Sequence, residues 1–304
     1  MDFGLLLQLL ISGCAAGSMY ALVALGHVMI WNAMGVLNFA HSEMVMLGGF
    51  LSLTFFVVLG LPYWLTFILV LICGCIIGAI IQRTMYQYMF FKRATRENFI
   101  IASIGLQVVL INLANVIWGS ENFAFPDIFK GKTVELFGAI IPIRNFYILG
   151  TAFILVIVLT LVLERTKVGT GMRAVAQDRE YAGAIGINVG LSDMLTFMVA
   201  SSLGCVAGLL LAPVYLVTAG LGQAVALKAF ATAVVGGFSN MMGAIVGGLF
   251  IGSAENLVSG FMGSEYKDAV AFIIMLVVLC LKPEGIMGKR TKKVKKGGKH
   301  NAKA

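Results

Sequence analysis

Residues 3–40 read FGLLLQLLISGCAAGSMYALVALGHVMIWNAMGVLNFA and contain no Asp, Glu, Lys or Arg. A helix needs roughly 20 apolar residues to cross about 30 Å of hydrocarbon. The run is therefore long enough for at least one span. Inside lipid, backbone N–H and C=O groups must be bonded within their own segment, so such a run predicts a helix. This stretch indicates an integral membrane protein.

The rest of the chain repeats the pattern. Hydrophobic residues make up 60% of the 304 residues and charged residues 12%, about half the charged fraction usual for a soluble domain. We therefore predict an all-α, polytopic transmembrane bundle without a sizeable soluble domain. Further charge-free runs cover residues 44–82, 98–120, 145–163, 194–227 and 229–254.

Helix-breaking residues divide these runs into about eight apolar helices. Gly60-Leu61-Pro62 separates two of them, because proline disfavours the helical conformation at the residue before it. The stretch from Gly236 to Asn240 interrupts the seventh helix, which is either broken or re-entrant. The predicted helices are 5–31, 38–59, 62–82, 98–118, 145–163, 191–212, 224–254 and 266–281.

Glycine pairs four residues apart recur in these helices. In lipid, such pairs let helix backbones approach closely, because association there depends on packing. They predict dense packing, either within the bundle or against a second subunit. The pairs are Gly13/Gly17, Gly74/Gly78, Gly204/Gly208, Gly243/Gly247 and Gly248/Gly252.

Loop charges predict the orientation of the chain. Residues 83–97 and 164–193 each hold four Lys or Arg, residues 282–304 hold nine, and the opposite connections hold four in total. The positive-inside rule places the basic segments in the cytoplasm. We predict a transmembrane domain over 1–288, a disordered basic cytoplasmic tail over 289–304, and an external N-terminus. The tail is also compatible with nucleic-acid binding, but its place after a span favours anionic lipid.

Motifs for enzymatic chemistry are missing from the sequence. The segment Lys130-Gly131-Lys132-Thr133 resembles the end of a phosphate-binding loop, but Pro126 stands where the first glycine is required. The five cysteines have no metal-site spacing. We expect no catalytic, cofactor or metal site on this chain, and any ATP to be used by separate subunits.

Residues 169–187 form the most informative polar stretch. They predict a short cytoplasmic helix with Arg173, Gln177 and Glu180 on one face, followed by small residues at Ala182 to Gly186. An ordinary solvated loop helix is one interpretation. The other is a docking element for a partner, in which charged side chains set the register. The candidate coupling residues are Arg173, Gln177, Asp178, Arg179, Glu180 and Gly186.

Four polar residues within the apolar regions are candidates for a translocation path: Asn38, His41, Glu43 and Lys228. Ionisable groups inside a membrane are costly and often functional. A glutamate in the first turn of a helix also complements the helix dipole, so Glu43 has a structural interpretation as well. Asn38 is a plausible N-cap. Lys228 has three possible carboxylate partners: Glu43, Asp193 and Glu255.

Four stretches together resemble one known family. The run Arg173-Ala-Val-Ala-Gln-Asp-Arg179 followed by Ala-Ile-Gly-Ile resembles the cytoplasmic coupling segment of branched-chain amino acid ABC transporter permeases. Residues 17–43, the stretch 228–237 and Lys282-Pro-Glu-Gly-Ile-Met-Gly288 resemble the same family in the same order. The chain length resembles the shorter of its two homologous permease subunits.

This resemblance implies a branched-chain amino acid importer in the bacterial inner membrane. The implied partners are a homologous second permease subunit, two cytoplasmic ATPase subunits and an extracytoplasmic substrate-binding protein. The implied mechanism is alternating access, and reversing the charge of Arg173 or Asp178 is expected to uncouple ATP hydrolysis from uptake.

The sequence also departs from the family pattern at His27, at Trp31-Asn32 and at Ser42. These positions lie near the expected substrate route, so related transporters of urea, short amides or other amino acids stay as alternatives. A channel or a membrane enzyme is a more distant alternative.

Overall fold

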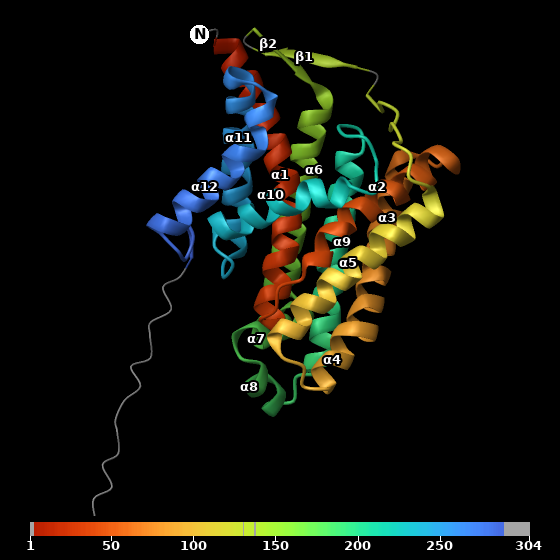
Figure 1. Cartoon of the computed structure of the whole chain (residues 1–304), viewed down its shortest axis with the longest axis vertical. Coiled ribbons are helices and arrows are strands. Elements are labelled where there is room, and N and C mark those ends of the chain that lie inside the picture. The colour runs from red at the N-terminus through yellow and green to blue at the C-terminus, as the bar shows by residue number, and fades with distance from the viewer. Residues whose placement is uncertain (1–2, 130, 137, 289–304) are drawn as a thin grey trace, which may run out of the picture.

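The structure, a computed structural model, describes residues 3–129, 131–136 and 138–288. The predicted basic tail, 289–304, lies outside the described residues. Helices dominate (Figure 1). They are α1 (Phe3–Met34), α2 (Glu43–Leu53), α3 (Tyr63–Ile81), α4 (Gln87–Phe91), α5 (Arg96–Trp118), α6 (Ile143–Arg165), α7 (Lys167–Gln177), α8 (Arg179–Ala184), α9 (Val189–Leu211), α10 (Leu221–Gly236), α11 (Met241–Met262) and α12 (Lys267–Leu281).

Short irregular turns extend several helices. A 3₁₀ turn, η1 (Phe39–Ser42), leads into α2, and π-helical turns follow α2 and α3 at Thr54–Val58 and Gln82–Tyr86. A last 3₁₀ turn, Ser264–Tyr266, precedes α12. The predicted helices 38–59 and 62–82 are therefore continuous helical segments over Phe39–Val58 and Tyr63–Phe91.

Seven helical segments of the described chain are long and apolar enough to cross a membrane, and α10 is a shorter apolar helix. The prediction of a polytopic helical bundle is confirmed. The predicted seventh helix is divided into α10 and α11 at Gly237, whose φ of +101° suits glycine and ends the helix. The predicted eighth helix is α12, which with 15 residues is shorter than a full span.

The described part of the chain also contains a small β-hairpin, which the all-α prediction did not include. Strands β1 (Thr133–Leu136) and β2 (Ala139–Pro142) pair antiparallel, with Thr133 opposite Pro142. The hairpin lies beside the N-terminal end of α1 (Figure 1).

The core of the bundle is formed by α1, α2 and α9. In the apolar window of α9, 78% of the residues are buried, against 17% in α5. Close backbone contacts make this packing possible. A Cβ atom at Gly48 would overlap the carbonyl of Cys205, and one at Gly208 would overlap the carbonyl of Val45. Glycine at both positions lets α2 and α9 pack backbone against backbone.

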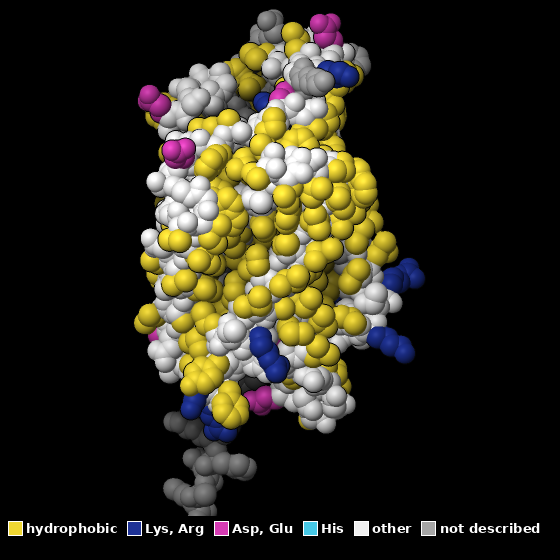
Figure 2. Space-filling view, turned by 90° about the vertical axis from the view of Figure 1, so that its right-hand side faces the viewer, with side chains coloured by type: hydrophobic (Ala, Val, Ile, Leu, Met, Phe, Trp, Pro, Cys, Tyr) yellow, Lys and Arg dark blue, Asp and Glu magenta, His cyan; other side chains and the backbone are white. Residues whose placement is uncertain are grey.

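The outer helices present apolar side chains to their surroundings. On α3 the exposed large side chains recur every fourth residue, which places them in one stripe: Trp64, Ile68, Ile72, Ile76 and Ile80. Figure 2 shows a broad apolar belt with charged side chains gathered toward its two ends. This distribution fits a lipid-embedded surface, where charges lie at the interfaces.

The basic segments share one end of the bundle. The Arg179 guanidinium of α8 lies 4.6 Å from the centre of the Phe90 ring of α4, and it also bonds the carbonyl of Ala33 at the end of α1. The Phe238 ring, which follows α10, lies 5.7 Å from the Trp31 ring near the same end of α1. Residues 286–287 hydrogen-bond to Val235 and Gly236. That this end faces the cytoplasm stays a prediction from the loop charges.

Candidate functional site

A buried carboxyl group stands at the start of α2. Glu43 is fully buried, and its Oε1 accepts a hydrogen bond of 3.0 Å from Gln107 Nε2 of α5. Its Oε2 has no hydrogen-bond partner among the described residues. Gly222 of α10 makes room for this carboxyl, because a Cβ atom there would overlap Oε2. Three helices therefore meet around one acidic side chain.

Two histidines lie beside it. The ring centres of His27 (α1) and His41 (η1) are 4.8 Å apart in an edge-to-face arrangement. Gly26 allows this approach, since a Cβ atom there would overlap the His41 ring. Neither His27 Nδ1 nor either ring nitrogen of His41 has a hydrogen-bond partner among the described residues. Buried polar atoms of this kind are uncommon and mark a site that needs an explanation.

The capping role predicted for Asn38 is wrong. Asn38 is buried and precedes η1, but its side chain makes no capping hydrogen bond, and its Oδ1 has no partner among the described residues. The 3₁₀ turn separates Asn38 from α2, which begins only at Glu43. The predicted helices 5–31 and 38–59 are separate in the structure, and the interruption between Met34 and Phe39 brings His41 and Glu43 into the core.

A cavity of about 520 Å³ opens next to this cluster. Its walls come from α1, η1, α5, α10 and α12. The polar side chains that line it are His27, Ser42, Gln107 and Gln223, and the other lining residues are apolar. The structure brings Asn38, His41 and Glu43 close to this cavity, as their positions beside Phe39 and Ser42 require.

Lys228 lies on a different face of α10. Its ammonium group contacts Glu255 at 2.5 Å and Asp268 at 2.8 Å, and Lys267 lies 3.7 Å from Glu255. Of the three carboxylates considered for it, Glu255 is its partner. The group connects α10, α11 and α12. Glu255 is fully buried, so it depends on a nearby cation.

The prediction of one short helix with Arg173, Gln177 and Glu180 on the same face is wrong, because the segment forms two helices. Asp178 adopts an extended conformation that ends α7, and its side chain caps α8 by accepting a 2.9 Å hydrogen bond from Tyr181 N–H. Aspartate is among the best N-cap residues, so it starts a second helix where the first one stops. Arg173, Gln177 and Glu180 therefore do not share one helical face, although all three are exposed.

Gly186 has a positive φ of +89°, and it ends the α8 segment in a conformation that favours glycine. Asp178 and Gly186 are both exposed. The candidate coupling residues other than Arg179 thus lie on the surface of the basic end of the bundle.

Arg179 instead points inward. Its two terminal nitrogens donate to both carboxylate oxygens of Asp193, at 3.0 and 2.8 Å, and Nη1 also donates to the Ala33 carbonyl at 2.6 Å. The Asp193 side chain is only 4% exposed. Bidentate pairs of this kind are strong and fix geometry. Arg179 joins α8 to the end of α1 and the start of α9.

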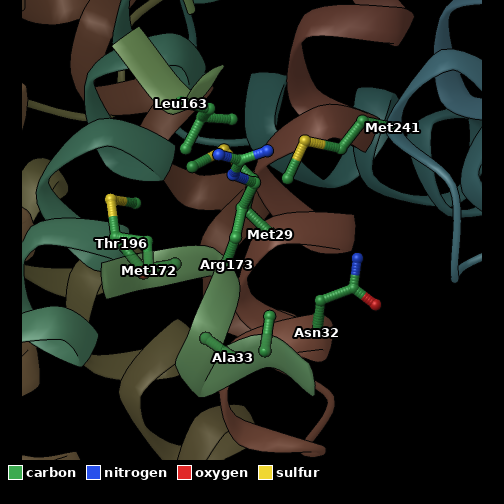
Figure 3. A pocket seen from close by; sticks show the side chains of 9 residues that line it. Met29, Asn32, Ala33, Leu163, Met172, Arg173, Thr196 and Met241 are labelled. Carbon is green, nitrogen blue, oxygen red and sulfur yellow. The ribbon is translucent and has the colours of Figure 1, made fainter. Parts of the chain in front are cut away.

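The contact of α7 with the bundle is shown in Figure 3. Arg173 and Met172 from α7 lie against Met29, Asn32 and Ala33 of α1, and Met241 of α11 is close by. The space between them is about 30 Å³, room for about two or three water molecules. This is a packing contact between α7 and the end of α1.

Sequence reasoning missed Gln107 as the partner of Glu43 and Asp193 as the partner of Arg179, and it named Glu255 only as one of three candidates for Lys228. Gln107 lies in an apolar helix, and only its polar character within the span could have drawn attention to it. Asp193 was considered for Lys228 but pairs with Arg179. His27 was noted only as a departure from a pattern.

A polytopic bundle with a buried polar site beside a cavity, and with α7 and α8 packed on the end of its core, fits a solute permease. The chain belongs to the family of branched-chain amino acid transport system permease components, whose family model matches residues 9–279.

Curated relatives agree with this assignment. The chain is 33% identical, over 93% of its length and 96% of theirs, to the high-affinity branched-chain amino acid transport system permease proteins LivH of Salmonella typhimurium (strain LT2) and of Escherichia coli (strain K12). The same values hold for BraD of Pseudomonas aeruginosa. No solved structure matches the chain. The prediction of the family is confirmed.

Proposed function

We propose that this chain is a permease subunit of an ATP-driven importer that moves leucine, isoleucine and valine across the bacterial inner membrane. The observation that carries the proposal is its similarity, over nearly its whole length, to permeases of branched-chain amino acid transport systems. The cavity beside Glu43 supports it, because apolar walls with a few polar groups suit a small solute with an aliphatic side chain.

The remaining parts of such an importer are proposed as separate chains. The sequence has no GxxxxGK[ST] motif, so ATP binding is assigned to two cytoplasmic ATPase subunits and not to this chain. A homologous second permease subunit and an extracytoplasmic binding protein complete the assembly. In this arrangement the permease has no catalytic activity of its own, and its basic end faces the cytoplasm.

The proposed mechanism is alternating access. The interrupted segments between Met34 and Glu43 and around Gly237 supply helix ends inside the bundle. Closure of the ATPases displaces α7 and α8, and the contacts of Arg173 and Arg179 with the end of α1 carry that displacement to the helix that bears His27.

Reconstitution of the whole transporter tests the proposal. Proteoliposomes containing this chain, its partner permease and the ATPases are expected to accumulate labelled leucine only with ATP inside and the loaded binding protein outside. Uptake of urea or a short amide in place of leucine, or conductance by this chain alone, would refute the assignment.

We predict that charge reversal on the exposed surface of α7 and α8 uncouples the ATPases. Arg173→Glu and Glu180→Arg are expected to lower leucine uptake about tenfold, the size of effect reached when a charge pair at a protein interface is lost. Basal ATP hydrolysis by the assembly is expected to continue. Both residues are exposed, whereas Asp178→Arg also removes the cap of α8 and is a less selective test.

Lys132→Glu is the matched control, since Lys132 is an exposed charge in the connection that carries the hairpin, at the opposite end. Wild-type uptake in both reversal variants would contradict the docking role of this surface.

A further inference from the structure

A carboxyl group without a cationic partner among the described residues, that of Glu43, lies behind the wall of the cavity described above. None of the described residues that line the cavity is Lys or Arg, and none of the ion pairs among the described residues includes Glu43. A buried carboxyl that lacks a cation is costly. A positively charged group on a ligand is therefore the natural complement to this site.

Glu43 does not line the cavity itself, but Gln107 does. Gln107 is half-buried on α5, and its amide nitrogen donates to Glu43 Oε1. Because the amide nitrogen donates to Glu43, the amide oxygen is left as an acceptor with no partner among the described residues. The orientation of Gln107 is thus determined by the acid behind it.

The remaining wall of the cavity suits an aliphatic side chain. Phe39, Phe230, Phe272 and Met275 contribute apolar surface. Phe39 and Leu227 are 37% and 58% exposed, so the cavity reaches the surface of this chain. Its volume of about 520 Å³ lies within the range of about 300–1,000 Å³ that small-molecule sites occupy.

We propose that this cavity is the substrate site of the permease and that the amide oxygen of Gln107, oriented by Glu43, accepts a hydrogen bond from the α-ammonium group of the transported amino acid. The proposal rests on the proposed function and adds to it the residue that recognises the charged end of the substrate. Gln223 of α10 offers a further amide to the substrate.

The test compares two replacements of Gln107 in the complete transporter in proteoliposomes, with the loaded binding protein in excess. Gln107→Met keeps the length and volume of the side chain but removes the acceptor. Loss of one hydrogen bond to a charged group predicts a fall in labelled-leucine uptake of about tenfold or more. ATP hydrolysis stimulated by the binding protein is expected to stay within about twofold of wild type, because the α7–α8 surface is untouched.

Gln107→Glu is the second variant. It restores acceptor oxygens at the same reach, and repulsion between two adjacent carboxyl groups favours retention of a proton on one of them. Uptake is expected to return to within about threefold of wild type, because a carboxyl oxygen at this position can still accept the hydrogen bond from the substrate. If Gln107 were needed only for its shape, leucine uptake would be higher with methionine than with glutamate at this position. The relative uptake of the two variants therefore distinguishes substrate recognition from packing.

Asn112→Met is the matched control. Asn112 lies on the same helix, is exposed, and bonds only to the carbonyl of Val108 one turn away. Uptake is normalised to the amount of each variant in the membrane. The proposal would be overturned if Gln107→Met took up as much leucine as Asn112→Met. It would also be overturned if Gln107→Glu took up less leucine than Gln107→Met. Failure of the wild-type transporter to take up leucine would instead refute the proposed function.

Discussion

Replacing Arg179 by alanine is expected to destabilise the protein by about 3–5 kcal/mol, the cost of leaving a buried charge without its partner. The substitution removes both hydrogen bonds to Asp193 and the one to the Ala33 carbonyl. Asp193 stays behind, nearly fully buried. We expect a markedly lower midpoint of thermal unfolding in detergent and little protein in the membrane.

Arg173→Ala serves as the control for this prediction, since Arg173 is an exposed arginine of the neighbouring helix α7. The double variant Arg179→Ala/Asp193→Ala is expected to regain part of the stability, because it no longer buries an unpaired carboxylate. If Arg179→Ala and Arg173→Ala had the same unfolding midpoint, the Arg179–Asp193 pair would contribute nothing to stability.

Replacing Gly252 by valine is expected to prevent α1 and α11 from packing. A Cβ atom at Gly252 would overlap the backbone of Gly17 and the carbonyl oxygen of Gly13. The neighbour on the other helix is backbone and has no side chain that can rotate away. Overpacking costs about 1–3 kcal/mol where side chains can adjust, and more where they cannot. We expect almost no folded protein by size-exclusion chromatography in detergent.

Gly105→Val tests whether the effect comes from the contact and not from losing a glycine. Gly105 lies in the membrane-spanning helix α5, and a Cβ atom there would meet no heavy atom within 4 Å. This variant is expected to fold like the wild type. Normal yields of Gly252→Val would mean that α1 and α11 can separate without loss of the bundle.

The membrane helices could be predicted because the information they need is local. The charge-free runs, the interruptions at Pro62 and Gly237, and the grouping of the basic loops each depend on neighbouring residues or on counts along the chain. The family could be recognised for the same reason, since its motifs are short stretches read in order. The break of α7 at Asp178 was missed, because a capping aspartate and a helical aspartate look alike in one sequence.

The partners of the buried polar residues could not be predicted in this way. Gln107 is 64 positions from Glu43, and Lys228 is 27 positions from Glu255. Helical periodicity relates residues only three or four positions apart, so it says nothing about which helix lies opposite.

By itself, therefore, the sequence determined a lipid-embedded helical bundle, because hydrophobic length and loop charge act on each segment separately. The permease family followed from the resemblance of its motifs. Only the tertiary structure decided that Arg179 holds α8 to the core and that Gln107 presents an acceptor to a cavity. Those roles exist only once packing brings side chains from different helices within hydrogen-bond distance.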